Sequence, residues 1–375
     1  MLHRIYFIPG LFGFGRLAGY DYFRHVRRAL EKRFADAGVP AYFEDLNSPP
    51  TSSFRHRARV LARAVSASCG PDSAPIHLVG HSTGGLDSRL VLSPTSNLGI
   101  DPSLTRWTSR VQTVVTVNTP HYGTPVASFF ASVSGTRLLY ALSLLTVVSL
   151  SLGEPSLAMF SKLLMGISRI DSLFGGDFRL FSRVADGVLR FVDREGRGEI
   201  LNFLSQVRTD QGAIVQSMPE AMDVFNAVAA DRPEVRYACV ASAAPPPPSL
   251  RLAKRIRSPY AALTAAVYAT LYQFASQRVE RYPYARTTPE QAEMLASSLE
   301  DEVSDTSNDG IVPTLSMLRG KLIWAGEADH LDVLGHFQDD GHPVQHVDWV
   351  TSGARFNRRR FQLLMDAVAS FQLGD

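Results

Sequence analysis

The stretch Gly80-His81-Ser82-Thr83-Gly84-Gly85 decides how the rest of this sequence is interpreted. It follows the short apolar run at residues 76–79 and leads into residues 86–92, whose apolar positions recur at helical spacing until Pro94. The order predicts a strand, a tight turn and a helix, with glycines where the two backbones come close. Ser82 would then occupy a strained turn with its hydroxyl exposed, the arrangement called a nucleophile elbow. The alternative is a glycine-rich turn of some other α/β protein.

Strands and helices are predicted to alternate along the first third of the chain. Residues 111–117 give the clearest strand, because they are β-branched at nearly every position and apolar enough to be buried on both faces. Such alternation predicts an α/β fold with a mostly parallel central sheet flanked by helices. The other predicted strands cover residues 5–8, 41–46, 76–79, 235–241 and 321–325, and further helices cover residues 20–34, 54–65 and 360–371.

The alternation stops after residue 126, where long apolar helical segments follow. A loop between a strand and a helix usually has about 2–6 residues, so residues 127–225 are predicted to form a helical cap, or lid, over the site. Two interpretations of the cap stay open, a lid that opens onto lipid and an ordinary buried helical subdomain. Residues 1–126 and 226–375 would form the two parts of the core, with a helical insertion at about 245–300.

The composition is that of an ordinary globular protein and argues against several functional classes. The 375 residues carry a net charge of +2, which gives no general attraction to nucleic acid. Cys69 and Cys239 are too few for a disulfide scaffold and are expected to be reduced thiols. The most apolar segment, residues 138–152, is shorter than the ~20 residues that cross a bilayer. No signal peptide precedes the first predicted strand, so the protein is expected in the cytoplasm, or outside the cell after loss of a leader.

A serine nucleophile needs a histidine as base and a carboxylate that orients the histidine. In α/β enzymes with this elbow, the acid and then the histidine follow the serine along the chain, each after a strand. His330 lies on the loop after the last predicted strand, and Asp309 lies upstream of that strand on a tight Asp-Gly turn. The alternatives on the same stretches are His336, His342 and His346 for the base, and Asp301, Glu302 and Asp305 for the acid.

Several stretches of the chain together carry a resemblance to one family. They are Gly10-Leu11-Phe12-Gly13-Phe14, residues 80–86, Thr119-Pro120-His121-Tyr122-Gly123-Thr124-Pro125, Pro219-Glu220-Ala221-Met222-Asp223-Val224-Phe225-Asn226, and Asn308-Asp309-Gly310 with His330-Leu331-Asp332. This set resembles the bacterial true lipases of the α/β-hydrolase superfamily, which cleave carboxylic esters of long-chain glycerides. The resemblance covers the core elements and does not extend to the capping helices.

The resemblance implies two backbone donors that bind the oxyanion of the tetrahedral intermediate. They are the N–H groups of Thr83, directly after the nucleophile, and of Leu11, in the first loop. Removal of one such donor costs roughly 10²–10³ in rate. The family usually has a histidine where this chain has Pro9, so the imidazole that helps to hold the loop is missing here.

The resemblance also bears on metal binding. In the family, the aspartate two residues after the catalytic histidine often binds a structural calcium ion, and Asp332 matches it. The downstream glutamine of that site corresponds to His336, and no clear second aspartate lies ahead of Asp309. Calcium prefers several oxygen ligands. The chemistry itself requires no cofactor, and a structural calcium at Asp332 is the one metal that the resemblance implies.

The sequence therefore predicts a serine hydrolase, a lipase or lipase-like carboxylesterase for esters of apolar, fatty acyl groups. Ser82 would attack the ester, His330 would move the proton, and Asp309 would orient His330. The expected partner is an ester or lipid substrate, at a lipid–water interface in the case of a lipase. The alternatives are an acyltransferase or an aliphatic polyester depolymerase of the same fold and, from a different class, a binding protein without catalytic activity.

Overall fold

The computed structural model describes residues 1–13, 16–17, 20–132, 135, 139, 142–143, 194–338, 345–346 and 349–374. Two helical segments predicted for the cap, residues 138–152 and 157–170, therefore lie outside the described residues except at positions 139 and 142–143. The third, residues 200–207, falls within the helix α8 (Arg194–Thr209). The division of the chain into a core and a cap stays a prediction.

A sheet of six parallel strands lies at the centre of the described structure, in the order β4-β1-β5-β6-β7-β8. The prediction of a mostly parallel sheet is confirmed, and each predicted strand agrees with the observed one to within two residues at either end. The six strands are β1 (His3–Ile8), β4 (Ala41–Asp45), β5 (Ile76–His81), β6 (Val111–Val117), β7 (Arg236–Ala243) and β8 (Lys321–Glu327). Two short antiparallel pairs, β2 (Arg16–Leu17) with β3 (Tyr20–Asp21) and β9 (Phe337–Gln338) with β10 (Gln345–His346), lie apart from this sheet.

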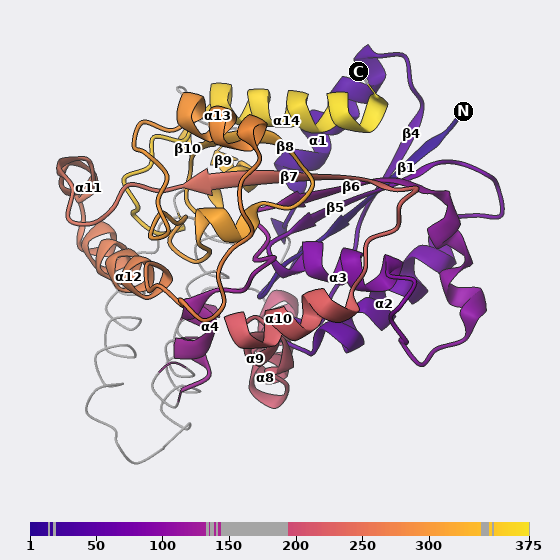
Figure 1. Ribbon diagram of the computed structural model, residues 1–375, viewed down its shortest axis with the longest axis horizontal. Helices are drawn as coiled ribbons and strands as arrows, with labels where there is room; N and C mark the ends of the chain where they lie inside the picture. Colours follow the sequence, from indigo (N-terminus) through magenta and orange to yellow (C-terminus); the bar gives the residue numbers. More distant parts are fainter. Residues whose placement is uncertain are drawn as a thin grey trace.

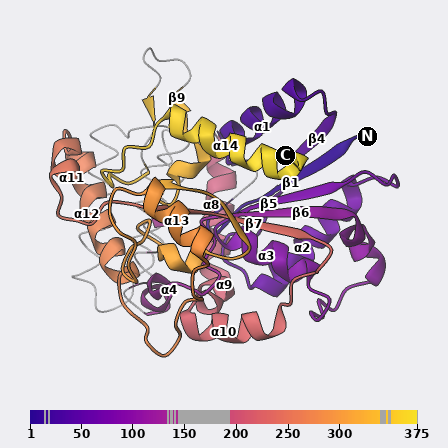
Figure 2. The same cartoon turned by 45° about the horizontal axis from the view of Figure 1, so that its top comes forward.

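Helices cover both faces of the sheet (Figure 1). The helices α1 (Arg24–Asp36) and α14 (Arg358–Leu373) pack on one face, whereas α2 (Phe54–Ser68) and α3 (Thr83–Leu92) pack on the other. Each face carries its own hydrophobic core. Successive side chains of a strand point to opposite faces, so Phe7 of β1 packs in the core under α1 and α14, and Tyr6 packs in the core under α2 and α3. A second view shows α1 and α14 side by side over the same face (Figure 2).

The helical insertion predicted at about 245–300 contains more than one helix. It begins with α11 (Leu250–Arg255) and α12 (Pro259–Ala275), which are separate because Ser258 caps a new helix whose first residue is proline. A further helix, α13 (Pro289–Ser298), lies in the same predicted insertion and begins at a capping box of Thr288 and Gln291.

The other helices of the described residues connect these elements. They are α4 (Pro125–Phe130), α9 (Gly212–Gln216), α10 (Pro219–Val228) and the 3₁₀ helices η1 (Pro102–Arg110), η2 (Thr314–Met317) and η3 (Asp332–Leu334). Within the described parts of the chain, every helix is too short or too polar to span a membrane. Both cysteines are buried free thiols, as predicted.

A buried histidine in the central sheet links the stability of this fold to pH. His77 in β5 is fully buried, with Nδ1 2.8 Å from Thr113 Oγ1 and Nε2 2.9 Å from His3 Nδ1. Burial lowers the pKa of His77 from 6.5 to about 3. His77 is therefore neutral in the folded protein at pH values where a histidine of the unfolded chain takes up a proton.

We expect His77 alone to lower the free energy of unfolding by about 2 kcal/mol between pH 7 and pH 5, because proton uptake by the unfolded chain favours unfolding. Urea denaturation at a series of pH values measures this effect. The variant His77→Gln, which does not titrate, should lose this part of the acid sensitivity. The same pH dependence in the variant and the parent protein would contradict the expectation.

Candidate active site

Ser82 lies in the turn between β5 and α3, at the carboxyl ends of the central strands. Its φ and ψ angles are 53° and −129°, a sparsely populated conformation for a residue with a side chain. The surroundings hold this conformation, because the Ser82 N–H donates to Val117 O of β6 at 2.8 Å. Gly84 makes room for the turn, since a Cβ atom at this position would lie 2.2 Å from Ile8 O of β1. The strand–turn–helix prediction for this stretch is confirmed.

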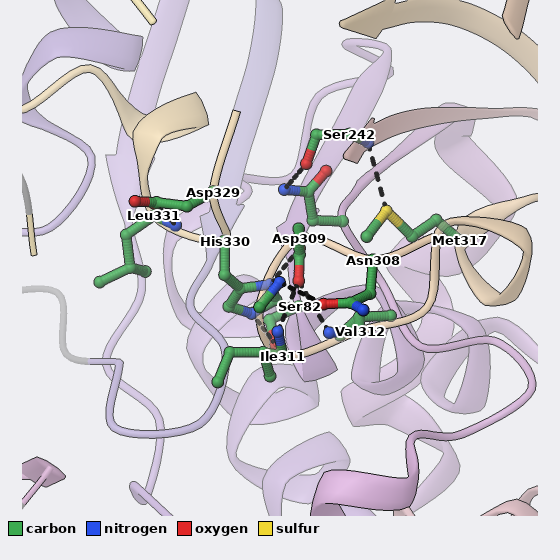
Figure 3. A network of polar contacts seen from close by, with 12 residues as sticks. Ser82, Ser242, Asn308, Asp309, Ile311, Val312, Met317, Asp329, His330 and Leu331 are labelled. Atoms are coloured by element: carbon green, nitrogen blue, oxygen red, sulfur yellow. Dashed lines mark hydrogen bonds and ion pairs between the residues drawn. The ribbon is translucent and has the colours of Figure 1, made fainter. Parts of the chain in front are cut away.

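The structure brings Ser82, His330 and Asp309 into one line of hydrogen bonds (Figure 3). Ser82 Oγ lies 2.9 Å from His330 Nε2, and His330 Nδ1 lies 2.6 Å from Asp309 Oδ2. Because a carboxylate only accepts, Nδ1 carries the hydrogen and Nε2 is left to accept the Ser82 O–H. All three residues are buried. This arrangement can take a proton from Ser82 when the hydroxyl attacks an electrophile.

Asp309 is held in place by the backbone of its own turn. Its Oδ1 atom accepts the N–H groups of Ile311 at 2.9 Å and Val312 at 2.7 Å, which leaves Oδ2 for His330. The His330 N–H also donates to the Asp309 carbonyl at 3.1 Å. The loops that carry these two side chains are therefore joined both through backbone and through side chains.

The alternative residues lie elsewhere. Asp301, Glu302 and Asp305 are exposed, as expected for a solvated acidic run, whereas Asp309 is fully buried. His336 is buried just after η3. His342 lies outside the described residues, and for His346 the structure describes only its place in β10.

The loop after β1 passes directly beside the nucleophile. A Cβ atom at Gly10 would lie 2.5 Å from Ser82 Cβ and 3.1 Å from Ser82 Oγ. Two later amides of the loop already have partners. The Phe12 N–H donates to Pro50 O and the Gly13 N–H donates to Gly10 O, both at 3.1 Å. Leu11 follows Gly10, and Thr83 begins α3, where N–H groups have no partner within the helix. Their role as oxyanion donors stays a prediction.

Arg57 is a residue of this site that the sequence did not single out. Its side chain is buried in α2, and its guanidinium donates to Pro9 O at 2.7 Å and to Pro49 O at 2.6 Å. The same group forms a 2.7 Å ion pair with Asp87 of the elbow helix. Arg57 thus holds the loop in which Pro9 replaces the family's histidine. The one sequence signal is its position on the apolar stripe of α2, three residues after Phe54.

We expect Arg57→Lys to slow the reaction of Ser82 with a fluorophosphonate by roughly 10- to 100-fold, because lysine keeps the charge but loses the planar fork that binds Asp87 and the loop carbonyls. The labelling rate of folded protein is the measurement. Arg110→Lys is the matched control, because Arg110 also binds three carbonyls and an aspartate, in the loop at residues 69–74. Equal slowing in both variants would contradict a role of Arg57 at the site.

The other stretches of the family resemblance meet around His121. The Asn226 side chain donates to His121 O at 2.7 Å, and Arg89 of the elbow helix donates to His121 Nδ1 at 3.3 Å. The His121 N–H donates to Ser316 O at 2.9 Å, next to the turn that carries Asp309. Burial lowers the pKa of His121 well below its usual value. His121 therefore ties the return from the predicted cap to the elbow and to the acid loop.

Asp332 is buried at the start of η3. Its Oδ2 atom accepts the Asp329 N–H at 2.8 Å, and Asp329 Oδ1 accepts the Asp332 N–H at 3.1 Å. Across the described residues, no group of three or more His, Cys, Asp or Glu side chains is arranged to hold a metal ion. The calcium ion expected at Asp332 stays a prediction.

Comparison with known proteins finds one relative whose sequence is similar to part of this chain. No protein-family model matches the sequence. A triacylglycerol lipase from Vibrio cholerae serotype O1 is 31% identical over 129 residues, which are 34% of this chain and 36% of that lipase. The chain thus matches about a third of the length of this curated relative.

Solved structures extend the comparison to the whole chain. The lipase of Staphylococcus hyicus superposes with a TM-score of 0.54 at 14% identity, covering 99% of this chain and 95% of that lipase. Lipase 1 from Pelosinus fermentans gives a TM-score of 0.52 at 18% identity and covers 98% of both chains. The chain has the α/β-hydrolase fold. The predicted resemblance to bacterial lipases is confirmed over the 129 residues that match the Vibrio cholerae lipase, whereas the likeness to the solved structures concerns the fold alone. In an α/β-hydrolase, the loops at the carboxyl ends of the strands form the site, which is where Ser82 lies.

Proposed function

We propose that this protein is a serine hydrolase that cleaves carboxylic esters of apolar acyl groups, as a lipase or lipase-like carboxylesterase. The line of hydrogen bonds from Ser82 through His330 to Asp309, at 2.9 and 2.6 Å, carries the proposal. A serine hydroxyl that donates to a neutral imidazole nitrogen loses its proton readily as it attacks a carbonyl carbon. The 31% identity to a triacylglycerol lipase supports an ester as the substrate.

The proposed reaction has two halves. In the first, Ser82 Oγ bonds to the ester carbon, its proton moves to His330 Nε2, and Asp309 stabilises the imidazolium. The Leu11 and Thr83 amides bind the oxyanion, and the alcohol leaves with the proton from His330. In the second, His330 takes a proton from water as the water attacks the acyl-enzyme, and it returns this proton to Ser82 Oγ as the bond to the acyl group breaks and the acid leaves. The chemistry of these groups requires no cofactor.

The preference for an apolar acyl group is supported by the side chains near the carboxyl edge of the sheet. Leu11, Phe12 and Ile311 are half-buried and pack on the main hydrophobic core. Phe129 of α4 stacks on Phe274 of α12 with ring centroids 3.9 Å apart. We infer that the acyl group lies against side chains of this kind, because they lose little by contact with a hydrocarbon chain and offer few partners to a polar acyl group.

The alternatives of the same fold share the chemistry up to the acyl-enzyme. An acyltransferase would pass the acyl group to an alcohol, so products measured with and without an alcohol acceptor separate it from a hydrolase. A polyester depolymerase would turn over solid aliphatic polyester in preference to emulsified triglyceride. A binding protein without activity would not react with a fluorophosphonate.

A fluorophosphonate is expected to label the parent protein at Ser82 and to leave Ser82→Ala unlabelled, because the attack needs an activated hydroxyl. Asp309→Asn should lower the turnover number by roughly 10⁴ through loss of the correct histidine tautomer. Mass spectrometry of the labelled peptide and ester hydrolysis measure the two effects. An unlabelled parent protein, or a label on another residue, would remove the basis of the proposal.

We expect p-nitrophenyl esters of medium or long acyl chains to be hydrolysed with a higher kcat/KM than the acetate, because the longer chain buries more apolar surface. A series from acetate to palmitate, run with and without a chelator, measures this preference. A fall in melting temperature with the chelator would support calcium at Asp332, whereas an unchanged value would rule out a stabilising ion there. A preference for acetate would contradict the proposed acyl specificity.

A further inference from the structure

His81 precedes Ser82 and is a second histidine beside the nucleophile, with no part in the proposed proton transfer. Its side chain is fully buried. Nε2 lies 2.9 Å from the backbone carbonyl oxygen of His330, and Nδ1 lies 2.8 Å from the Tyr22 hydroxyl. The His81 and His330 rings are neighbours, with centroids 4.9 Å apart. The sequence gave no sign of this contact with His330.

The partners of His81 determine where its hydrogen lies. A carbonyl oxygen only accepts, so Nε2 must carry the hydrogen that bridges to His330 O. Burial, together with the nearby His330, lowers the pKa of His81 well below 6.5, so the ring is neutral and Nδ1 has a free lone pair. The Tyr22 hydroxyl then donates to Nδ1. The contacts form one chain of hydrogen bonds. The Tyr22 hydroxyl donates to His81, and His81 donates to the carbonyl oxygen of His330.

We propose that His81 and Tyr22 are positioning residues that hold the backbone of His330 so that its imidazole faces Ser82. The His330 N–H is fixed by Asp309 O at 3.1 Å, and its side chain by Asp309 Oδ2 at 2.6 Å. His81 fixes the carbonyl at the opposite end of the residue. Without this donor, a buried carbonyl would lack a partner and the residue would be free to turn toward one.

The same contacts prevent His81 from competing with His330 as a base. Its Nε2 is committed as a donor and its Nδ1 is occupied by the Tyr22 hydroxyl, so neither nitrogen is free to accept the proton of Ser82. A neutral ring at 4.9 Å also adds no positive charge beside the imidazolium that His330 forms during the reaction. Only one of the two adjacent histidines is therefore left to exchange protons with the substrate.

The test compares His81→Leu, His81→Gln and Tyr22→Phe in the full chain, by kcat and KM for a p-nitrophenyl ester and by melting temperature. We expect His81→Leu to lower kcat by roughly 10- to 100-fold with KM nearly unchanged, because a buried acceptor loses its donor. His81→Gln should recover part of the loss, since its amide can donate to the same carbonyl. Tyr22→Phe should lower kcat by roughly three- to tenfold.

His77→Leu is the matched control, because His77 lies in the same strand, is equally buried and is also hydrogen-bonded through its ring. It should lower the melting temperature without lowering the kcat of the folded protein. A wild-type kcat in His81→Leu would overturn the inference, as would losses of kcat that follow melting temperature alike in the His77 and His81 variants. If His81→Leu does not fold, the Gln and Phe variants decide the question.

Nitrogen-15 NMR of labelled histidines gives a readout that does not depend on turnover. His81 should keep a protonated Nε2 and an unprotonated Nδ1 between pH 5 and pH 8, and titration of His81 in this range would overturn the inference. The inference rests on the proposed function, yet the two fail differently. A parent protein that no fluorophosphonate labels defeats the function, whereas equal labelling rates in the parent and in His81→Leu defeat only the role of His81.

Discussion

The 2.9 Å hydrogen bond between Ser82 Oγ and His330 Nε2 joins residues 248 positions apart, and much of the described structure serves to close it. Ser82 is held by a strained turn that is wedged between β1, β5 and β6. His330 is held from the other side by the turn of Asp309. Hydrogen bonds of this kind tolerate little displacement, so the precision of the site comes from the rigidity of the sheet edge.

The fold could be predicted from the sequence because the central strands are short apolar runs that alternate with predicted helices, a pattern typical of a parallel sheet. Loops that follow parallel strands meet at one edge of the sheet, which is why the order of Ser82, Asp309 and His330 along the chain could predict that their side chains lie together. The capping box at Thr288 and the Ser258-Pro259 pair also carry local signals for helix starts, and these were overlooked. Local chemistry therefore accounts for most of the elements.

The supporting contacts around the site could not be predicted in the same way. In the sequence, Arg57 resembles any basic residue of a helix. Its role becomes visible only in the structure, where it donates from α2 to the loop after β1. Tyr22 and His81 are likewise 59 positions apart, and only the tertiary fold makes one the partner of the other. Each such contact depends on which surfaces meet, so the residue type at a given position does not identify its partner.

The long connection between β6 and β7 contributes none of the three proposed catalytic residues. These strands are neighbours in the sheet, yet residues 118–235 lie between them. Ser82, Asp309 and His330 all belong to other connections, and contacts at His121 and Asn226 fasten the two ends of this one to the core. We therefore expect changes in length or composition between these anchors to leave the proposed reacting groups in place. The proposed reacting groups and this connection are therefore encoded in different stretches of the gene, which selection can alter one at a time.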